Sequence, residues 1–179
     1  RHIPDLTYEN FRNFWETYYH PSNSFIFFYG NDDPEKRLKL VEGYLKPYKK
    51  KKVKSVVPLA KPFKRPKKVE YAYDVGDDKE IEKKHYLVVN WKLPDTSDPV
   101  LNFSLRILGH ILIGTPASPL KKALLDSGLG EDLAGIGMES ELRHFIFSAG
   151  LKGTRQRHAK KIEKLIFDTL ESLVRDGID

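Results

Sequence analysis

Cysteine is absent from this chain of 179 residues. Disulfide bonds, cysteine-ligated zinc and iron–sulfur clusters are therefore excluded within it. The sequence also lacks an apolar run of the ~18–20 residues that a membrane-spanning helix needs, and no basic-then-apolar signal segment follows Arg1. We expect no membrane span, and we expect the chain to be excised from a larger protein.

The histidines are isolated from one another and lack the spacing that a catalytic zinc ion needs. None has a second histidine four residues later, and neither H-x-x-E-H nor H-E-x-x-H occurs. A Gly-x-Ser-x-Gly elbow, which a serine hydrolase would use, is missing as well. We therefore expect no metal site, no cofactor and no catalytic residue in this chain, whose six histidines are His2, His20, His85, His110, His144 and His158.

Acidic residues are missing from one long stretch, Lys46 to Lys68, which holds 11 Lys and Arg residues. Without it the chain has 20 basic and 25 acidic residues, so the net charge of +6 comes from this stretch alone. Its prolines exclude a regular helix. We interpret residues 46–68 as a basic, Pro-containing linker within a single domain that covers residues 1–179. Clustered Lys and Arg could instead bind phosphates through counterion release, and charge is the only support for that alternative.

Five segments have the apolar spacing of helices. The first follows Thr7, a good N-cap residue, and carries an aromatic stripe that we expect to lie in the core. It ends at His20, because the residue before a proline avoids the helical region. The segment from Asp98 to about Ile113 is so apolar that we expect it to be buried on most sides. The other three helices are predicted at residues 34–45, 118–127 and 156–175.

Strands are predicted where aromatic and β-branched residues form short runs or alternate with polar ones. Ser24–Tyr29 has the composition of a buried strand. Val69–Val75 and residues 85–93 are predicted to form a hairpin around an acidic turn at residues 76–83. Residues 131–136 and 142–152 are predicted to pair around a Gly-Ile-Gly-Met turn.

The order of these elements indicates the fold class. Helices and hairpins are intermixed and do not alternate strictly with single strands. This order predicts an α+β fold, with a mostly antiparallel sheet of about five strands and helices packed on one face.

Two long blocks of the sequence resemble one protein family. The first lies between Leu6 and Leu38 and contains LTYENF, YYHPSN and DPEKRL. It is similar to a stretch of the pitrilysin (insulinase-like) zinc metallopeptidases, most closely the presequence protease and falcilysin branch. The second, from Gly114 to Leu133, is GTPASPLKKALLDSGLGEDL, and HFIFSAGLKG resembles the strand after it. The similarity covers nearly everything except the basic linker.

This resemblance implies a clamshell enzyme of four similar α+β domains, each with the fold of mitochondrial-processing-peptidase-like metallohydrolases. Such enzymes degrade unstructured peptides, for example presequences, inside a closed chamber. The zinc ion of the parent enzyme would be held by its first domain, on an inverted His-x-x-Glu-His motif. The present chain would correspond to the second, non-catalytic domain and should be inactive alone.

The same resemblance implies partners and a compartment. The partners would be an unstructured peptide substrate and the missing catalytic zinc domain of the same chain, with no nucleic acid bound. The compartment would be an organelle, namely the mitochondrial matrix, a plastid or a related compartment.

One substrate-binding site also follows from the resemblance. In relatives, the sheet edge of the second domain takes up a substrate strand by main-chain pairing, as other open edges do. Small residues in the matching segment would let another backbone approach. Residues 138–140 (Met, Glu and Ser) depart from the family pattern. The matching segment is Leu133, Ala134, Gly135, Ile136 and Gly137.

We therefore predict a non-catalytic domain of a zinc metalloendopeptidase, which forms part of the chamber wall and holds a substrate strand. One alternative is a stand-alone interaction module whose basic arm binds an acidic protein or RNA. The other is a non-catalytic processing-peptidase-like subunit, of the sort found beside respiratory complexes. In the leading case, faces made for missing neighbours should leave apolar patches exposed.

Overall fold

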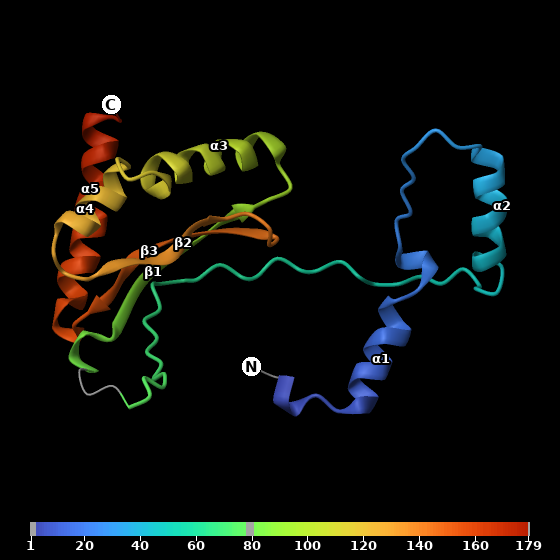
Figure 1. The fold of residues 1–179 in the computed structure, drawn as a ribbon, viewed down its shortest axis with the longest axis horizontal. Helices are drawn as coiled ribbons and strands as arrows, with labels where there is room; N and C mark the ends of the chain where they lie inside the picture. Colours follow the sequence, from blue (N-terminus) through green and yellow to red (C-terminus); the bar gives the residue numbers. More distant parts are fainter. Residues whose placement is uncertain (1–2, 78–80, 179) are drawn as a thin grey trace. The chain divides into compact units, whose positions relative to one another are not determined.

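The computed structural model describes residues 3–77 and 81–178. The chain divides into two compact units, residues 1–57 and residues 58–179, and the boundary lies inside the basic stretch (Figure 1). The expectation of one domain over residues 1–179 stays a prediction.

The first unit consists of helices joined by turns. Thr7 caps its first long helix as predicted, because its Oγ1 accepts a hydrogen bond of 3.2 Å from the backbone N–H of Asn10. Asp33 caps the second in the same way, through the N–H of Glu35 at 2.9 Å. The elements are a 3-10 turn at Ile3–Asp5, α1 at Tyr8–Tyr18, a 3-10 turn at Pro21–Asn23 and α2 at Pro34–Leu45.

The predicted strand Ser24–Tyr29 is not a strand in this structure, and no side chain of residues 3–57 is buried. Phe25 is 92% and Tyr29 95% exposed. A strand forms only where a neighbour supplies partners for its backbone groups, and the described part of this unit contains no sheet. The aromatic stripe of α1, expected in the core, is exposed too, at Phe11, Phe14, Trp15 and Tyr19.

The second unit contains an antiparallel sheet of three strands in the order β1-β3-β2. The strands are β1 at His85–Asp95, β2 at Asp132–Glu139 and β3 at His144–Thr154. The expected sheet of about five strands is therefore wrong for the described residues, whereas the α+β class and the antiparallel pairing are confirmed.

The other missing strand is Val69–Val75, which was predicted to form a hairpin with β1. It makes side-chain contact with that strand and no ladder: the ring of Tyr73 packs edge-on against Tyr86, with centroids 5.5 Å apart, and the Tyr73 hydroxyl donates to the carbonyl of Lys84. The predicted acidic turn at residues 76–83 lies partly outside the described residues.

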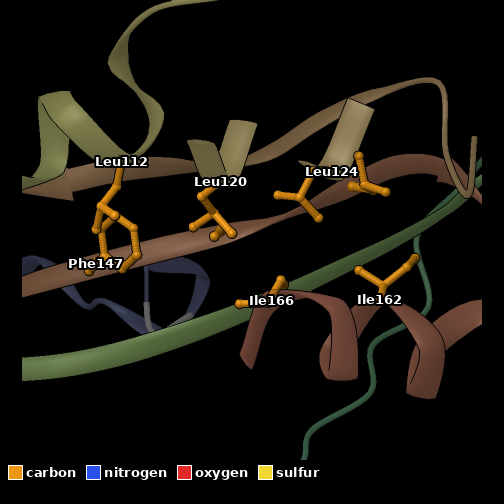
Figure 2. Close-up of a cluster of buried hydrophobic side chains, with 8 residues drawn as sticks. Leu112, Leu120, Leu124, Phe147, Ile162 and Ile166 are labelled. Atoms are coloured by element: carbon orange, nitrogen blue, oxygen red, sulfur yellow. The ribbon is translucent and has the colours of Figure 1, made fainter. Parts of the chain in front are cut away.

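The helices of the second unit bury one face of this sheet. Register partners such as Trp91 and Phe147, or Val89 and Ala149, place apolar side chains on that face. Figure 2 shows the leucines along one side of this core, the isoleucines of another helix opposite them, and Phe147 beside Leu112. Leu120, Leu124, Ile162 and Ile166 are fully buried there. The helices are α3 at Pro99–Gly109, a π-helix at His110–Gly114, α4 at Pro119–Asp126, a 3-10 turn at Gln156–His158 and α5 at Ala159–Asp176.

The expectation that the first of these helices is buried on most sides is wrong. Phe103 is 67% and Ile107 46% exposed, and only Gly109 of α3 is buried. The segment Pro99–Asp126 is long and apolar enough to cross a bilayer by length and composition alone. The helix is interrupted at residues 115–118, however. Leu120 and Leu124, beyond this break, lie in the hydrophobic core that packs on the sheet. We therefore interpret it as a set of helices that pack on the sheet.

Candidate functional site

The segment Leu133–Gly137 lies in β2, at the edge of the sheet. β3 pairs with one side of β2, and no strand of the described residues pairs with its other side. Unpaired backbone groups along such an edge are a template for a further strand. A segment that binds a substrate strand by main-chain pairing must lie at such an open edge, as Leu133–Gly137 does.

A β-bulge interrupts β2 in the middle of the segment. Ala134 pairs with Gly150 and Gly137 pairs with Ser148, so that Gly135 and Ile136 together oppose the single residue Ala149. The Gly-Ile-Gly-Met sequence was predicted to be the turn of a hairpin. It is instead this bulge within the strand, and the chain reverses at residues 140–143. Bulges bend an edge strand and redirect its side chains.

The two glycines of the segment are explained by this bulge. Gly135 has φ of +95° and Gly137 has φ of +70°, a region that residues with a Cβ rarely adopt. A Cβ added to Gly135 would also lie 3.0 Å from the backbone of Ser148. The small residues are therefore required by β2 and β3 themselves, in addition to any approach by another chain.

The bulge leaves the candidate residues in different environments. Ala134 is buried, and Leu133 packs against the core cluster. Ile136 is 68% exposed, although it is a large apolar residue. The bulge thus presents an apolar side chain to solvent at the open edge.

The end of α3 lies against the same strand. A Cβ added to Gly109 would come within 2.6 Å of the Cβ of Met138, and one added to Gly137 would lie 3.1 Å from Cγ2 of Ile113. Glycine at both positions allows the helix and the strand to approach closely. The helix therefore forms a wall beside the edge of the sheet.

A cavity of about 360 Å³ lies between this wall and β2. We refer to it as the β2 pocket. Its only polar side chains are those of Arg106 and His110, and Ala134 is the one candidate residue that does not line it. The lining residues are Arg106, Gly109, His110, Ile113, Gly114, Leu133, Gly135, Ile136, Gly137 and Met138.

Sequence reasoning did not connect Arg106 and His110 to this site. They are four residues apart, and such residues lie on one side of a helix. This spacing indicates that the two side chains lie together. It does not indicate that this side of α3 faces β2.

An ion pair holds the beginning of β2. Lys152 Nζ lies 2.8 Å from Oδ2 of Asp132, its register partner. The hydrogen bond from Lys152 lowers the pKa of Asp132, and the N–H of Leu133 contributes in the same direction. Both side chains are about half exposed, so the pair contributes little to the stability of the fold.

The histidines do not converge on any point of the described structure. His20 accepts a hydrogen bond from the N–H of Ser22 at 3.1 Å, and His144 Nε2 accepts one from the N–H of Ala60 at 3.0 Å. Among residues 3–77 and 81–178, no three His, Asp or Glu side chains are grouped so that they could hold a metal ion. The described residues therefore do not fit a zinc site. His2 lies outside them.

Comparison with known proteins gives a consistent picture. Residues 5–179 match the Peptidase M16 inactive domain. The chain is 43% identical to presequence protease 1 (chloroplastic/mitochondrial) of Arabidopsis thaliana over 99% of its length, and 34% identical to the mitochondrial presequence protease of Mus musculus over 99%. It is also 35% identical, over 99%, to protein HypA of Clostridium perfringens. It spans only 17–18% of the length of these relatives.

Proposed function

Because the chain belongs to the M16 peptidase family and matches its inactive domain, we propose that it is a non-catalytic domain of a zinc metalloendopeptidase. In the parent enzyme it forms part of the wall of a peptide-degrading chamber and holds one strand of the substrate. The observation that carries this proposal is the family match over residues 5–179, together with an open sheet edge at residues 133–137.

We propose that the zinc ion of the parent enzyme is bound by another part of that enzyme. The described residues offer no grouped ligands, which supports the proposal that the catalytic zinc is held by another part of the parent enzyme. We accordingly propose that residues outside this chain perform peptide-bond hydrolysis. Unstructured peptides are the substrate class that we propose for the whole enzyme.

The first unit supports a role inside a larger protein. Alternate side chains of residues 25–29 point to opposite faces if the segment is extended, and both sets are exposed: Phe25 and Tyr29 on one, Phe28 at 45% on the other. A strand that is apolar on both faces is typical of a sheet covered on both sides. We propose that the missing catalytic domain of the same chain covers this unit.

The edge of β2 supports a role in substrate binding. Pairing between main chains gives affinity without reading the sequence of the added strand, which suits an enzyme that degrades many peptides. The exposed Ile136 and the β2 pocket beside it add a surface for the side chains of that strand.

N-methylated peptides test the main-chain pairing directly. An unstructured peptide is labelled with a fluorophore, and its anisotropy is measured on titration with the chain. N-methylation of alternate residues removes donors of the peptide backbone while leaving its side chains unchanged. Two methylated peptides are made, one for each set of alternate residues. We expect methylation of the set whose N–H groups face β2 to abolish binding. The peptide methylated at the other set should bind nearly as well as the parent peptide. Equal binding of all three peptides would exclude strand addition.

Hydrogen exchange then locates the bound strand. We expect amides of Leu133–Gly137 to exchange more slowly in the presence of the unmethylated peptide, with amides of β1 unchanged. Protection confined to the basic stretch would instead favour the interaction module described above.

The compartment is proposed from the same relatives. Relatives named as chloroplastic or mitochondrial favour an organelle, such as the mitochondrial matrix or a plastid, and a bacterial relative is similar over the same length. Fractionation of the source cells with an antibody against the chain checks this assignment, and recovery with the cytosol would contradict it.

A further inference from the structure

The β2 pocket has a charge that main-chain pairing does not use. Arg106 and His110 lie one turn apart on the side of α3 and its π-helical extension that faces β2. No carboxylate is among the residues that line the pocket. No side chain that lines the pocket can therefore carry a negative charge.

Arg106 is not neutralised by its own helix. The residues three and four positions away are Asn102, Phe103, Gly109 and His110, none of which is acidic. Its guanidinium group forms no ion pair with any residue of the described ranges, in contrast to Lys152, which Asp132 neutralises nearby. An unpaired guanidinium group next to a cavity is a ready partner for an anion.

The rest of the pocket is apolar and lies along the open edge. Ile113 and Met138 line it, and so does Ile136, which is largely exposed. Since the residues of β2 from Leu133 to Met138, except Ala134, line the pocket, a peptide strand added to this edge would run past the pocket. One of its side chains, or its terminus, would then reach Arg106.

We propose that the β2 pocket binds a carboxylate of an extended peptide, which Arg106 holds with His110 beside it. The edge of β2 then prefers peptides in which an acidic group stands next to apolar residues. This inference rests on the proposed function and adds a preference to it. The planar fork of a guanidinium group matches the two oxygens of a carboxylate, which an ammonium group does less well.

A carboxylate can come from two sources, an acidic side chain or the C-terminus of the peptide. The experiment therefore uses fluorescent peptides of one apolar sequence in pairs. One pair has Glu or Gln at a central position, and the other has a free or an amidated C-terminus. Affinities for the 179-residue chain are measured by fluorescence anisotropy.

We expect loss of the bound carboxylate to weaken binding by about tenfold, the usual scale for a hydrogen-bonded charge pair. The pair of peptides that shows this loss identifies the source. In the Arg106→Gln variant both members of that pair should bind equally, and in Arg106→Lys part of the discrimination should return. Arg157→Gln, at an exposed arginine away from the pocket, serves as the control and should discriminate like the wild type.

The inference and the proposed function fail differently. Peptides that bind equally with and without a carboxylate, and that still lose binding on N-methylation, would overturn the carboxylate preference and leave strand addition standing. Discrimination that persists in Arg106→Gln would overturn the assignment to this pocket. If no peptide responds to N-methylation, the proposed function fails, and this inference fails with it. Circular dichroism checks that each variant is folded.

Discussion

Gly109 of α3 and Met138 of β2 lie so close that a Cβ added to the glycine would come within 2.6 Å of the methionine Cβ. The obstructing atom is attached directly to the backbone of β2, so it cannot swing aside as the end of a long side chain can. This contact sets the distance between the helix and the edge strand, and the β2 pocket lies beside it.

Gly109→Ala should therefore destabilise the second unit. Alanine favours a helix by about 1 kcal/mol over glycine, but forcing an atom into this contact costs about 1–3 kcal/mol. We expect a net loss in the free energy of unfolding, measured by urea denaturation with circular dichroism. Gly43→Ala is the matched control, because Gly43 lies in α2 with no atom within 4 Å of the added Cβ. A Gly109→Ala variant as stable as the wild type would show that α3 can move from β2.

Ile166→Ala should unfold the second unit at lower urea concentration. Ile166 is fully buried between α4 and the sheet, and truncating such a side chain costs about 2–5 kcal/mol. Val174→Ala on the same helix is the control. Val174 is 88% exposed, so its truncation should change stability by less than about 0.5 kcal/mol. Equal effects at the two positions would mean that α5 does not pack as described.

We expect the stability of the protein to depend on pH through the carboxyl group of Asp95. The backbone N–H of Ser97 donates to Asp95 Oδ1 at 2.8 Å and lowers the pKa of this carboxyl group, with the Ser97 side chain and Arg143 adding to the effect. A carboxyl group whose pKa is lower in the folded state stabilises the protein above its unfolded pKa, near 3.8. That contribution is lost as the pH falls below this value.

Asp95→Asn keeps an acceptor for the N–H of Ser97 and removes the charge. We expect the unfolding midpoint of the wild type to decrease more steeply than that of the variant between about pH 4 and pH 2. The two should be parallel above pH 5. Parallel curves down to pH 2 would contradict the lowered pKa of Asp95. Thermal unfolding followed by circular dichroism provides the measurement.

The first unit should make the isolated chain self-associate. Large exposed apolar patches are uncommon on monomeric proteins, and residues 25–29 present one, with Phe27 at 75% exposure. We expect sedimentation velocity to show concentration-dependent association, and the double variant Phe25→Ser, Phe27→Ser to reduce it. Phe63→Ser, at another exposed phenylalanine, is the control and should associate like the wild type. A monomeric wild type would contradict the prediction.

Local signals in the sequence predicted the helices well. Thr7 and Asp33 cap the starts of α1 and α2, and Pro119 is the first residue of α4. Residues 156–175 were predicted as a helix, and the structure has a 3-10 turn followed by α5 up to Asp176. These signals act within a few residues, so they can be interpreted without knowing the tertiary structure.

The sheet could not be predicted in the same way. Ser24–Tyr29 and Val69–Val75 have the composition of strands, but a strand also needs a neighbouring strand, and neither segment belongs to the sheet of the described structure. The bulge at Gly135 was mistaken for a turn, because glycine at a positive φ is common to both. Arg106 was overlooked, since its role depends on which element lies opposite α3.

Zinc content and peptide cleavage, measured on the same sample, test the central claim most directly. The purified chain is incubated with zinc, dialysed and examined for bound metal, and an unstructured peptide is then added with and without a chelator. The described residues contain no grouped ligands, so we expect no stoichiometric zinc and no cleavage that the chelator abolishes. One zinc ion per chain, with chelator-sensitive cleavage of the peptide, would show that this domain is itself catalytic.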